Sequence, residues 1–156
     1  MELCEALAEH TAATDRASES ISLVHGDFRL DNLLFDIKGG AEPIAVLDWQ
    51  TLTIGNGLTD IGYFLGCGIG DGLRHAHEGE LLDLYCAQMT ARGVPMNRDS
   101  IWRDYVVGAL HGVSTAVFSA AFVVRTERGD ANFLSMVRGA AALCHAHGSL
   151  EVMRKG

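Results

Sequence analysis

Three oxygen-bearing side chains, Asp27, Asn32 and Asp48, have the types and spacing to bind a hard cation and to activate a nucleophile. Asn32 follows Asp27 within one polar loop, and Asp48 ends a later apolar run. Mg²⁺ takes oxygen ligands and keeps several of its waters, so an amide and a carboxylate suffice to hold it. Asp27 is then left as a carboxylate near the metal, available to orient or deprotonate a nucleophile.

The elements that position these side chains are predicted from short apolar runs bounded by turn residues. Residues 21–24 are expected to form a buried strand, and residues 33–35 and 43–47 two further strands. Residues 36–40 include two glycines and an aspartate, which tolerate positive φ, so they are predicted as the turn between the last two strands. A small hairpin sheet would therefore bracket the polar loop and bring Asn32 close to Asp48.

The rest of the chain has helical periodicity. A helix is expected at residues 2–13, before the strands, and four helices after them, at residues 58–66, 74–91, 97 or 100 to 125, and 130–152. Asn56 or Thr59 is a candidate cap for the first of these four, and Asp130 for the last. The fold class is therefore α+β and mostly helical, with a small β element followed by about four helices.

Composition excludes several kinds of partner. The net charge of −8 over 156 residues makes nucleic acid and anionic membrane poor partners. Residues 105–124 carry no formal charge over about the length of a membrane span, but His111 and several hydroxyl residues interrupt them, so a buried core helix is the expectation. The four cysteines are scattered, which indicates free buried thiols and a cytoplasmic protein.

Two separate blocks together resemble a known family. His25-Gly-Asp27 with Asn32, followed by Leu47-Asp48-Trp49, is similar to the motifs of the aminoglycoside phosphotransferase and choline-kinase-like superfamily, which has a protein-kinase-like fold. The resemblance continues to Asp60 and covers about residues 22–66. It implies the C-terminal lobe of a kinase, with a β-hairpin element carrying the catalytic loop.

The resemblance also implies a role for each matching residue. Asp27 would be the catalytic aspartate that accepts a proton from a substrate hydroxyl, and Asn32 and Asp48 would bind Mg²⁺. His25 would support the catalytic loop, and Asp60 would anchor it through backbone hydrogen bonds. The reaction implied is transfer of the γ-phosphoryl group of ATP (or GTP) to a hydroxyl of a small molecule.

Arg29 lies inside the same loop, and two roles remain open for it. It could contact a phosphate or the substrate, or it could form a surface ion pair. The motif alone does not choose between them.

Lysine is scarce in this sequence. Lys38 and Lys155 are the only two, and neither precedes His25, whereas such kinases use a lysine on an N-terminal strand to bind the nucleotide phosphates. Residues 1–156 are therefore expected to be a single domain, the catalytic lobe without its nucleotide-binding lobe. A separate N-terminal lobe or a second chain would then cover the exposed nucleotide side.

Two other functions compete with the kinase. The chain could be a catalytically inactive remnant that acts as a binding or interaction module, which the lysine shortage favours. It could also be a metal-dependent phosphohydrolase that uses the same carboxylates, although two protein ligands are few for that chemistry.

Overall fold

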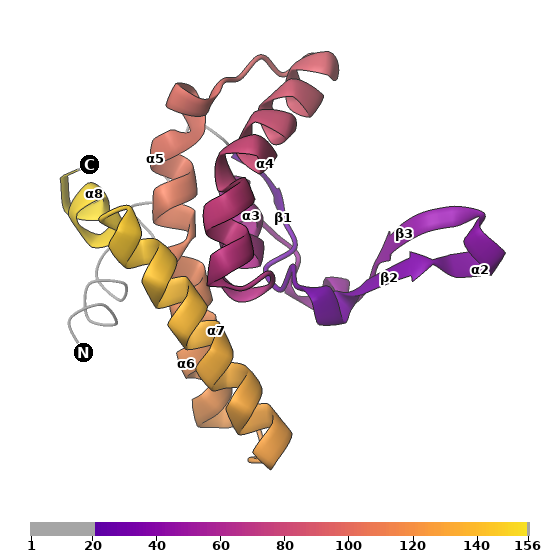
Figure 1. The fold of residues 1–156 in the computed structure, drawn as a ribbon, viewed down its shortest axis with the longest axis vertical. Helices are drawn as coiled ribbons and strands as arrows, with labels where there is room; N and C mark the ends of the chain where they lie inside the picture. Colours follow the sequence, from indigo (N-terminus) through magenta and orange to yellow (C-terminus); the bar gives the residue numbers. More distant parts are fainter. Residues whose placement is uncertain (1–20, 156) are drawn as a thin grey trace.

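The computed structural model describes residues 21–155, in which four short strands precede six helices, α3 to α8 (Figure 1). The structure is thus mostly helical with a small β region, as the sequence predicts. The helix expected at residues 2–13 lies outside the described residues.

The strands form two separate antiparallel pairs rather than the single expected sheet. β1 (Ile21–Val24) pairs with β4 (Thr53–Asn56), and β2 (Leu33–Asp36) pairs with β3 (Glu42–Val46). The sequence prediction missed β4, because its four residues include a glycine and an asparagine and show no clear alternation. The expected burial of β1 is also wrong: only Val24 of this strand is buried. A two-stranded sheet leaves most of its side chains open to solvent.

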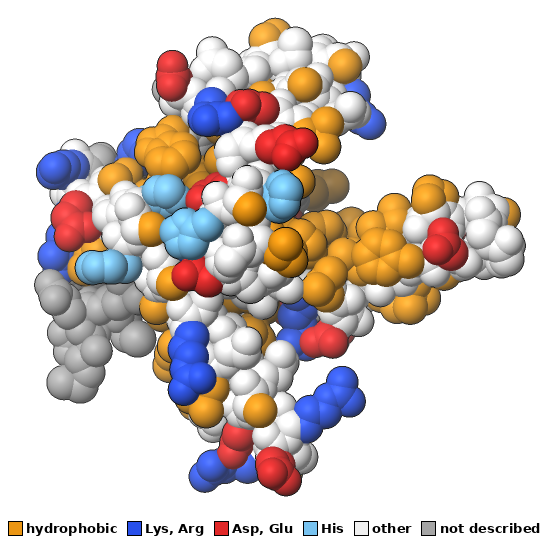
Figure 2. Space-filling view, in the orientation of Figure 1, with side chains coloured by type: hydrophobic (Ala, Val, Ile, Leu, Met, Phe, Trp, Pro, Cys, Tyr) orange, Lys and Arg blue, Asp and Glu red, His pale blue; other side chains and the backbone are white. Residues whose placement is uncertain are grey.

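The β2–β3 hairpin extends away from the helices as an arm (Figure 1). At its tip, the expected turn forms the single helical turn α2 (Ile37–Gly40), where Lys38 and both glycines have positive φ. Lys38 forms an ion pair with Glu42 at this tip. Figure 2 shows hydrophobic side chains gathered along the arm, and Phe35 is among the exposed ones.

Six helices follow, two more than expected. They are α3 (Leu58–Cys67), α4 (Asp71–Ala91), α5 (Arg98–Gly108), α6 (Leu110–Phe122), α7 (Glu127–Ala146) and α8 (Ser149–Lys155). The prediction merged α5 with α6 because Ala109, between them, keeps helical backbone angles. It merged α7 with α8 although Gly148, whose φ is +61°, separates them, as a left-handed glycine commonly does.

The helix caps follow the expectation in part. Asn97 caps α5 in a reciprocal capping box with Ser100, which confirms one of the two predicted starts. Asp130 does not cap α7. Thr126 takes that place, since its Oγ1 accepts from the backbone N–H of Gly129 at 3.0 Å. Asp130 lies inside the first turn of α7 and pairs with Arg125 instead.

The helices enclose the main core. Its fully buried members come from α3 to α8 and include Leu58, Leu82, Ile101, Leu110 and Leu143. Helix α3 lies very close to the junction of α5 and α6: a Cβ at Gly62 would lie 2.7 Å from the backbone nitrogen of Ala109. This close contact fixes the place of α3, which carries two of the residues at the site described below.

The α5–α6 segment, Arg98–Phe122, is long and apolar enough to cross a membrane by length and composition, and half of its apolar window is buried inside the protein. Two polar contacts join this segment to the strands and to the loop after β1. Asn56 donates to the backbone carbonyl of Asp104 at 2.7 Å, and His111 bonds to the loop after β1.

Candidate active site

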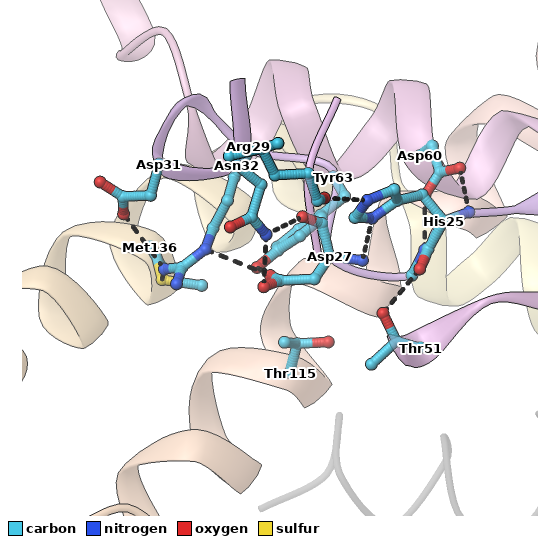
Figure 3. A network of polar contacts seen from close by, with 12 residues as sticks. His25, Asp27, Arg29, Asp31, Asn32, Thr51, Asp60, Tyr63, Thr115 and Met136 are labelled. Atoms are coloured by element: carbon cyan, nitrogen blue, oxygen red, sulfur yellow. Dashed lines mark hydrogen bonds and ion pairs between the residues drawn. The ribbon is translucent and has the colours of Figure 1, made fainter. Parts of the chain in front are cut away.

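The loop after β1 is held by a carboxylate from α3. Asp60, in the first turn of that helix, accepts the backbone N–H of His25 at 2.7 Å and that of Gly26 at 2.9 Å (Figure 3). Gly26 has a φ of +82°, and a Cβ there would lie 2.9 Å from the carbonyl oxygen of Thr51. Only glycine fits this tight turn without strain.

The buried ring of His25 joins the two sequence blocks. Its Nδ1 accepts the backbone N–H of Asp27 at 3.2 Å, so the ring proton sits on Nε2, which donates to the carbonyl of Leu47 at 2.8 Å. The Trp49 ring packs against it at 4.8 Å. His25 thus ties the loop that carries Asp27 to the residue preceding Asp48.

Both oxygens of the Asp27 carboxylate have a fixed donor. Tyr63, on α3, donates its hydroxyl to Oδ1 at 2.9 Å, and the Asn32 amide donates to Oδ2 at 2.8 Å. The same Asn32 nitrogen also donates to the backbone carbonyl of Asp27 at 2.8 Å. The Asn32 backbone carbonyl accepts the N–H of Leu47 at 2.8 Å, which places Asn32 at the base of the β2–β3 hairpin.

Arg29 lies beside Asp27 in a partly buried ion pair. Its Nε is 3.2 Å from Asp27 Oδ1 but makes no hydrogen bond there, although the atom is buried. Its Nη1 lies 3.4 Å from a carboxylate oxygen of Asp31 and also contacts the sulfur of Met136 at 3.8 Å. The guanidinium is therefore held beside the Asp27 carboxylate without strong hydrogen bonds.

A cavity of about 920 Å³ opens beside this loop. Asp27, Arg29 and Asp48 are the charged residues among its described lining. Its other walls include residues of α6 and α7, among them Phe118 and Met136. His25, Asn32 and Asp60 are not among its lining residues.

Asp48 differs from the other candidates in its exposure. It has left-handed backbone angles (φ 60°, ψ 60°) just before the short helix η2 (Trp49–Thr51), and its side chain is exposed. No hydrogen bond to its carboxylate is present among the described residues. Its oxygens are thus open to a cation, whereas those of Asp27 already have protein donors.

The amide of Asn32 and the carboxylate of Asp48 are oxygen donors of the kind that Mg²⁺ takes, and of the two only Asp48 lines the cavity. Because the Asn32 nitrogen is bonded to Asp27, its Oδ1 is the amide atom left for a metal, and Asp48 adds a hard carboxylate. Within residues 21–155, no three His, Cys, Asp or Glu side chains lie close enough to form a metal cluster.

Sequence reasoning missed Tyr63 and His111. Tyr63 is fully buried, and its ring meets the His111 ring edge-on at 5.3 Å. Burial and the neighbouring Asp27 carboxylate raise the pKa of Tyr63 far above its usual value, so its hydroxyl keeps its proton. His111 Nε2 donates to the carbonyl of Gly26 at 2.7 Å. Tyr63 had a signal in the sequence, because it lies three residues after Asp60 on the same helix face.

The family model named Phosphotransferase enzyme family matches residues 2–93, more than half of the chain. The match includes the loop after β1, both strand pairs and α3, but not α6 and α7, which form the other walls of the cavity. The chain belongs to the phosphotransferase enzyme family.

Several curated proteins match over a shorter stretch. Human acyl-CoA dehydrogenase family member 11 is 54% identical over 43 residues, which is 28% of this chain and 5% of that protein. Probable acyl-CoA dehydrogenase IBR3 of Arabidopsis thaliana is 39% identical over 62 residues, 40% of this chain and 7% of that protein. The chain thus spans less than a tenth of these relatives, whose names describe the longer proteins. No solved structure matches the chain significantly.

Proposed function

We propose that this chain is the C-terminal catalytic lobe of a Mg²⁺-dependent kinase that phosphorylates a hydroxyl of a small molecule. One observation carries the proposal: the Asp27 carboxylate is held in a fixed orientation at the wall of a large cavity that the open Asp48 carboxylate also lines. A fixed base beside a cation site is the arrangement that phosphoryl transfer needs, because its catalysis is mostly positioning and charge neutralisation.

In this proposal, Asp27 accepts the proton of the acceptor hydroxyl. The oxygen of that hydroxyl forms a bond to the γ-phosphorus of ATP or GTP. The bond between that phosphorus and the β,γ-bridging oxygen breaks, and the nucleoside diphosphate leaves with the bonding electrons. Asn32 and Asp48 would hold Mg²⁺, which would supply charge neutralisation at the phosphates. His25 and Asp60 keep the loop in place and do not touch the reacting atoms.

Arg29 is the one cation in the described lining of the cavity. We assign it to the transferred phosphate or to an anionic part of the substrate. Its place in the cavity lining beside Asp27 supports this role, because a guanidinium binds anionic oxygens.

The partners follow from the same geometry. A second body, either an N-terminal nucleotide-binding lobe or another chain, would cover the exposed apolar residues of the strands, such as Leu23, Phe35 and Ile54. The net charge of −8 argues against nucleic acid and anionic membrane as partners. The three described cysteines, Cys67, Cys86 and Cys144, are free thiols, which suits the cytoplasm.

The test uses the full-length protein with Mg²⁺–ATP and four acceptors: water, glycerol, choline and glucosamine. Phosphorylated products are followed by ³¹P NMR, and Mg²⁺–ATP binding by calorimetry. Asp27→Asn is expected to lower kcat by about 10²–10⁴, and Asp48→Asn to weaken Mg²⁺–ATP binding. Asp31→Asn, an exposed carboxylate in the same loop, is the matched control and should change neither. Equal turnover by Asp27→Asn and the wild type would contradict the proposal.

A binding module without catalysis is the second candidate. Lys38 favours it, because this lysine lies at the tip of the arm in an ion pair with Glu42 rather than at the cavity. Saturable binding of Mg²⁺–ATP without any phosphorylated product, in the wild type and in Asp27→Asn alike, would support this alternative.

A further inference from the structure

We propose that Tyr63 is a positioning residue that fixes the plane of the Asp27 carboxylate for phosphoryl transfer, an inference that rests on the proposed function. The Tyr63 hydroxyl is 2.9 Å from Oδ1 of Asp27, and the Asn32 amide is 2.8 Å from Oδ2. Because each oxygen has its own donor, rotation of the carboxylate about its Cβ–Cγ bond breaks both hydrogen bonds. The pair of donors therefore sets the direction in which Asp27 meets an acceptor hydroxyl.

Tyr63 is rigid enough for this role. Its side chain is fully buried, and its ring packs edge-on against His111, with an angle of 85° between the two planes. His111 in turn donates to the carbonyl of Gly26, the residue next to Asp27. The tyrosine ring and the loop that carries Asp27 thus both contact His111 of α6.

Helix α3 joins two kinds of support in one turn. Asp60 binds the loop backbone, and Tyr63, three residues later on the same face, binds the side chain of Asp27. Helix α3 lies close against the backbone of Ala109, since a Cβ at Gly62 would be 2.7 Å from the Ala109 nitrogen. The loop backbone and the Asp27 carboxylate are therefore both bonded to one closely packed helix.

A simpler interpretation is that Tyr63 is an ordinary core tyrosine whose hydroxyl needs any buried acceptor. A second buried tyrosine, Tyr105, allows the positioning role to be distinguished from that of an ordinary core tyrosine. Tyr105 is also fully buried and donates its hydroxyl to a carboxylate, that of Glu78, at 2.5 Å. Neither Tyr105 nor Glu78 lines the cavity. Loss of either hydroxyl should cost similar stability, but only Tyr63 should affect catalysis.

The experiment compares Tyr63→Phe with Tyr105→Phe in the full-length protein. Phosphate release from Mg²⁺–ATP to water gives kcat and KM, and thermal unfolding gives Tm. Both variants are expected to lower Tm. Tyr63→Phe alone should lower kcat, by about 10- to 100-fold, because a hydrogen bond to a charged group is lost where the geometry matters. The KM for Mg²⁺–ATP should stay unchanged, since Asn32 and Asp48 remain.

The outcomes separate this role from the proposed function. If Asp27→Asn is slow while Tyr63→Phe turns over like the wild type, Tyr63 has no positioning role and the kinase proposal stands. If Asp27→Asn and the wild type are equal, the proposed function and this role both fall. Should Tyr63→Phe not fold, 3,5-difluorotyrosine at position 63 keeps the ring and donates more strongly. It should lower kcat by at least about twofold at unchanged Tm, and an unchanged kcat overturns the role.

Discussion

The two hydrogen bonds from the loop after β1 to Asp60 should contribute measurably to the stability of this protein. The backbone N–H groups of His25 and Gly26 donate to the two carboxylate oxygens at 2.7 and 2.9 Å. In Asp60→Asn, one oxygen remains as a neutral acceptor, and the other is replaced by an NH₂ group that faces an N–H donor. One charge-assisted bond is weakened, and the other is lost with its donor left unsatisfied.

The magnitude follows from these two changes. A hydrogen bond to a charged group contributes about 1.5–3 kcal/mol, and an unsatisfied buried donor costs about 1–3 kcal/mol. Because Asp60 is only half-buried, water relieves part of this cost. We expect Asp60→Asn to lower the free energy of unfolding by about 2–4 kcal/mol. Urea titration followed by circular dichroism measures the difference, and an unchanged m-value shows that the unfolding transition is the same.

Asp31→Asn is the matched control. It also removes one negative charge, here from the loop itself, but the Asp31 side chain is 56% exposed and its cation, Arg29, is 3.4 Å away. Surface ion pairs of this kind contribute about 0–1 kcal/mol. A loss in Asp60→Asn as small as that of Asp31→Asn would refute the reasoning, because the loop would then be held without the Asp60 bonds.

Three further predictions concern the helices. Gly62→Ala should lower the free energy of unfolding in urea by about 1–3 kcal/mol, because the new Cβ would lie 2.7 Å from the Ala109 nitrogen. In Gly72→Ala the new Cβ meets open space, so this variant should raise the free energy of unfolding by up to about 1 kcal/mol. Burial alone would raise the pKa of Glu78, but hydrogen bonds from its neighbours lower it below 4.5. Its ionisation therefore stabilises the fold above that pH and ceases to do so as pH falls, so Glu78→Gln should flatten the acid limb of Tm against pH. Asn97→Ala should cost about 1 kcal/mol in the same unfolding assay, because α5 loses its capping box.

Each of these three has an outcome that contradicts it. Equal stabilities of the two alanine variants would show that α3 does not press against the α5–α6 junction. If Tm falls with decreasing pH as steeply in Glu78→Gln as in the wild type, this carboxylate does not contribute to the loss of stability in acid. No loss in Asn97→Ala would mean that water satisfies the start of α5 as well as the cap does.

The sequence by itself determined the local elements at the site. The apolar runs and turn residues predicted β1, β2, β3 and the hairpin turn, and helical periodicity predicted α3 and α4. The motif singled out Asp27, Asn32, Asp48 and Asp60 by residue type and spacing. These features depend on neighbours a few residues apart, so a single sequence carries them.

Tertiary structure decided what joins distant parts of the chain. No periodic pattern in the sequence predicts that β1 pairs with β4. Nor does one predict the hydrogen bond from His111 to Gly26, which lie 85 residues apart. The hydrogen bond from the Tyr63 hydroxyl to Asp27 depends on how α3 packs in the folded protein. The physical reason is the same in each case: a hydrogen bond or a close contact across the core depends on how elements pack, and local patterning does not record that.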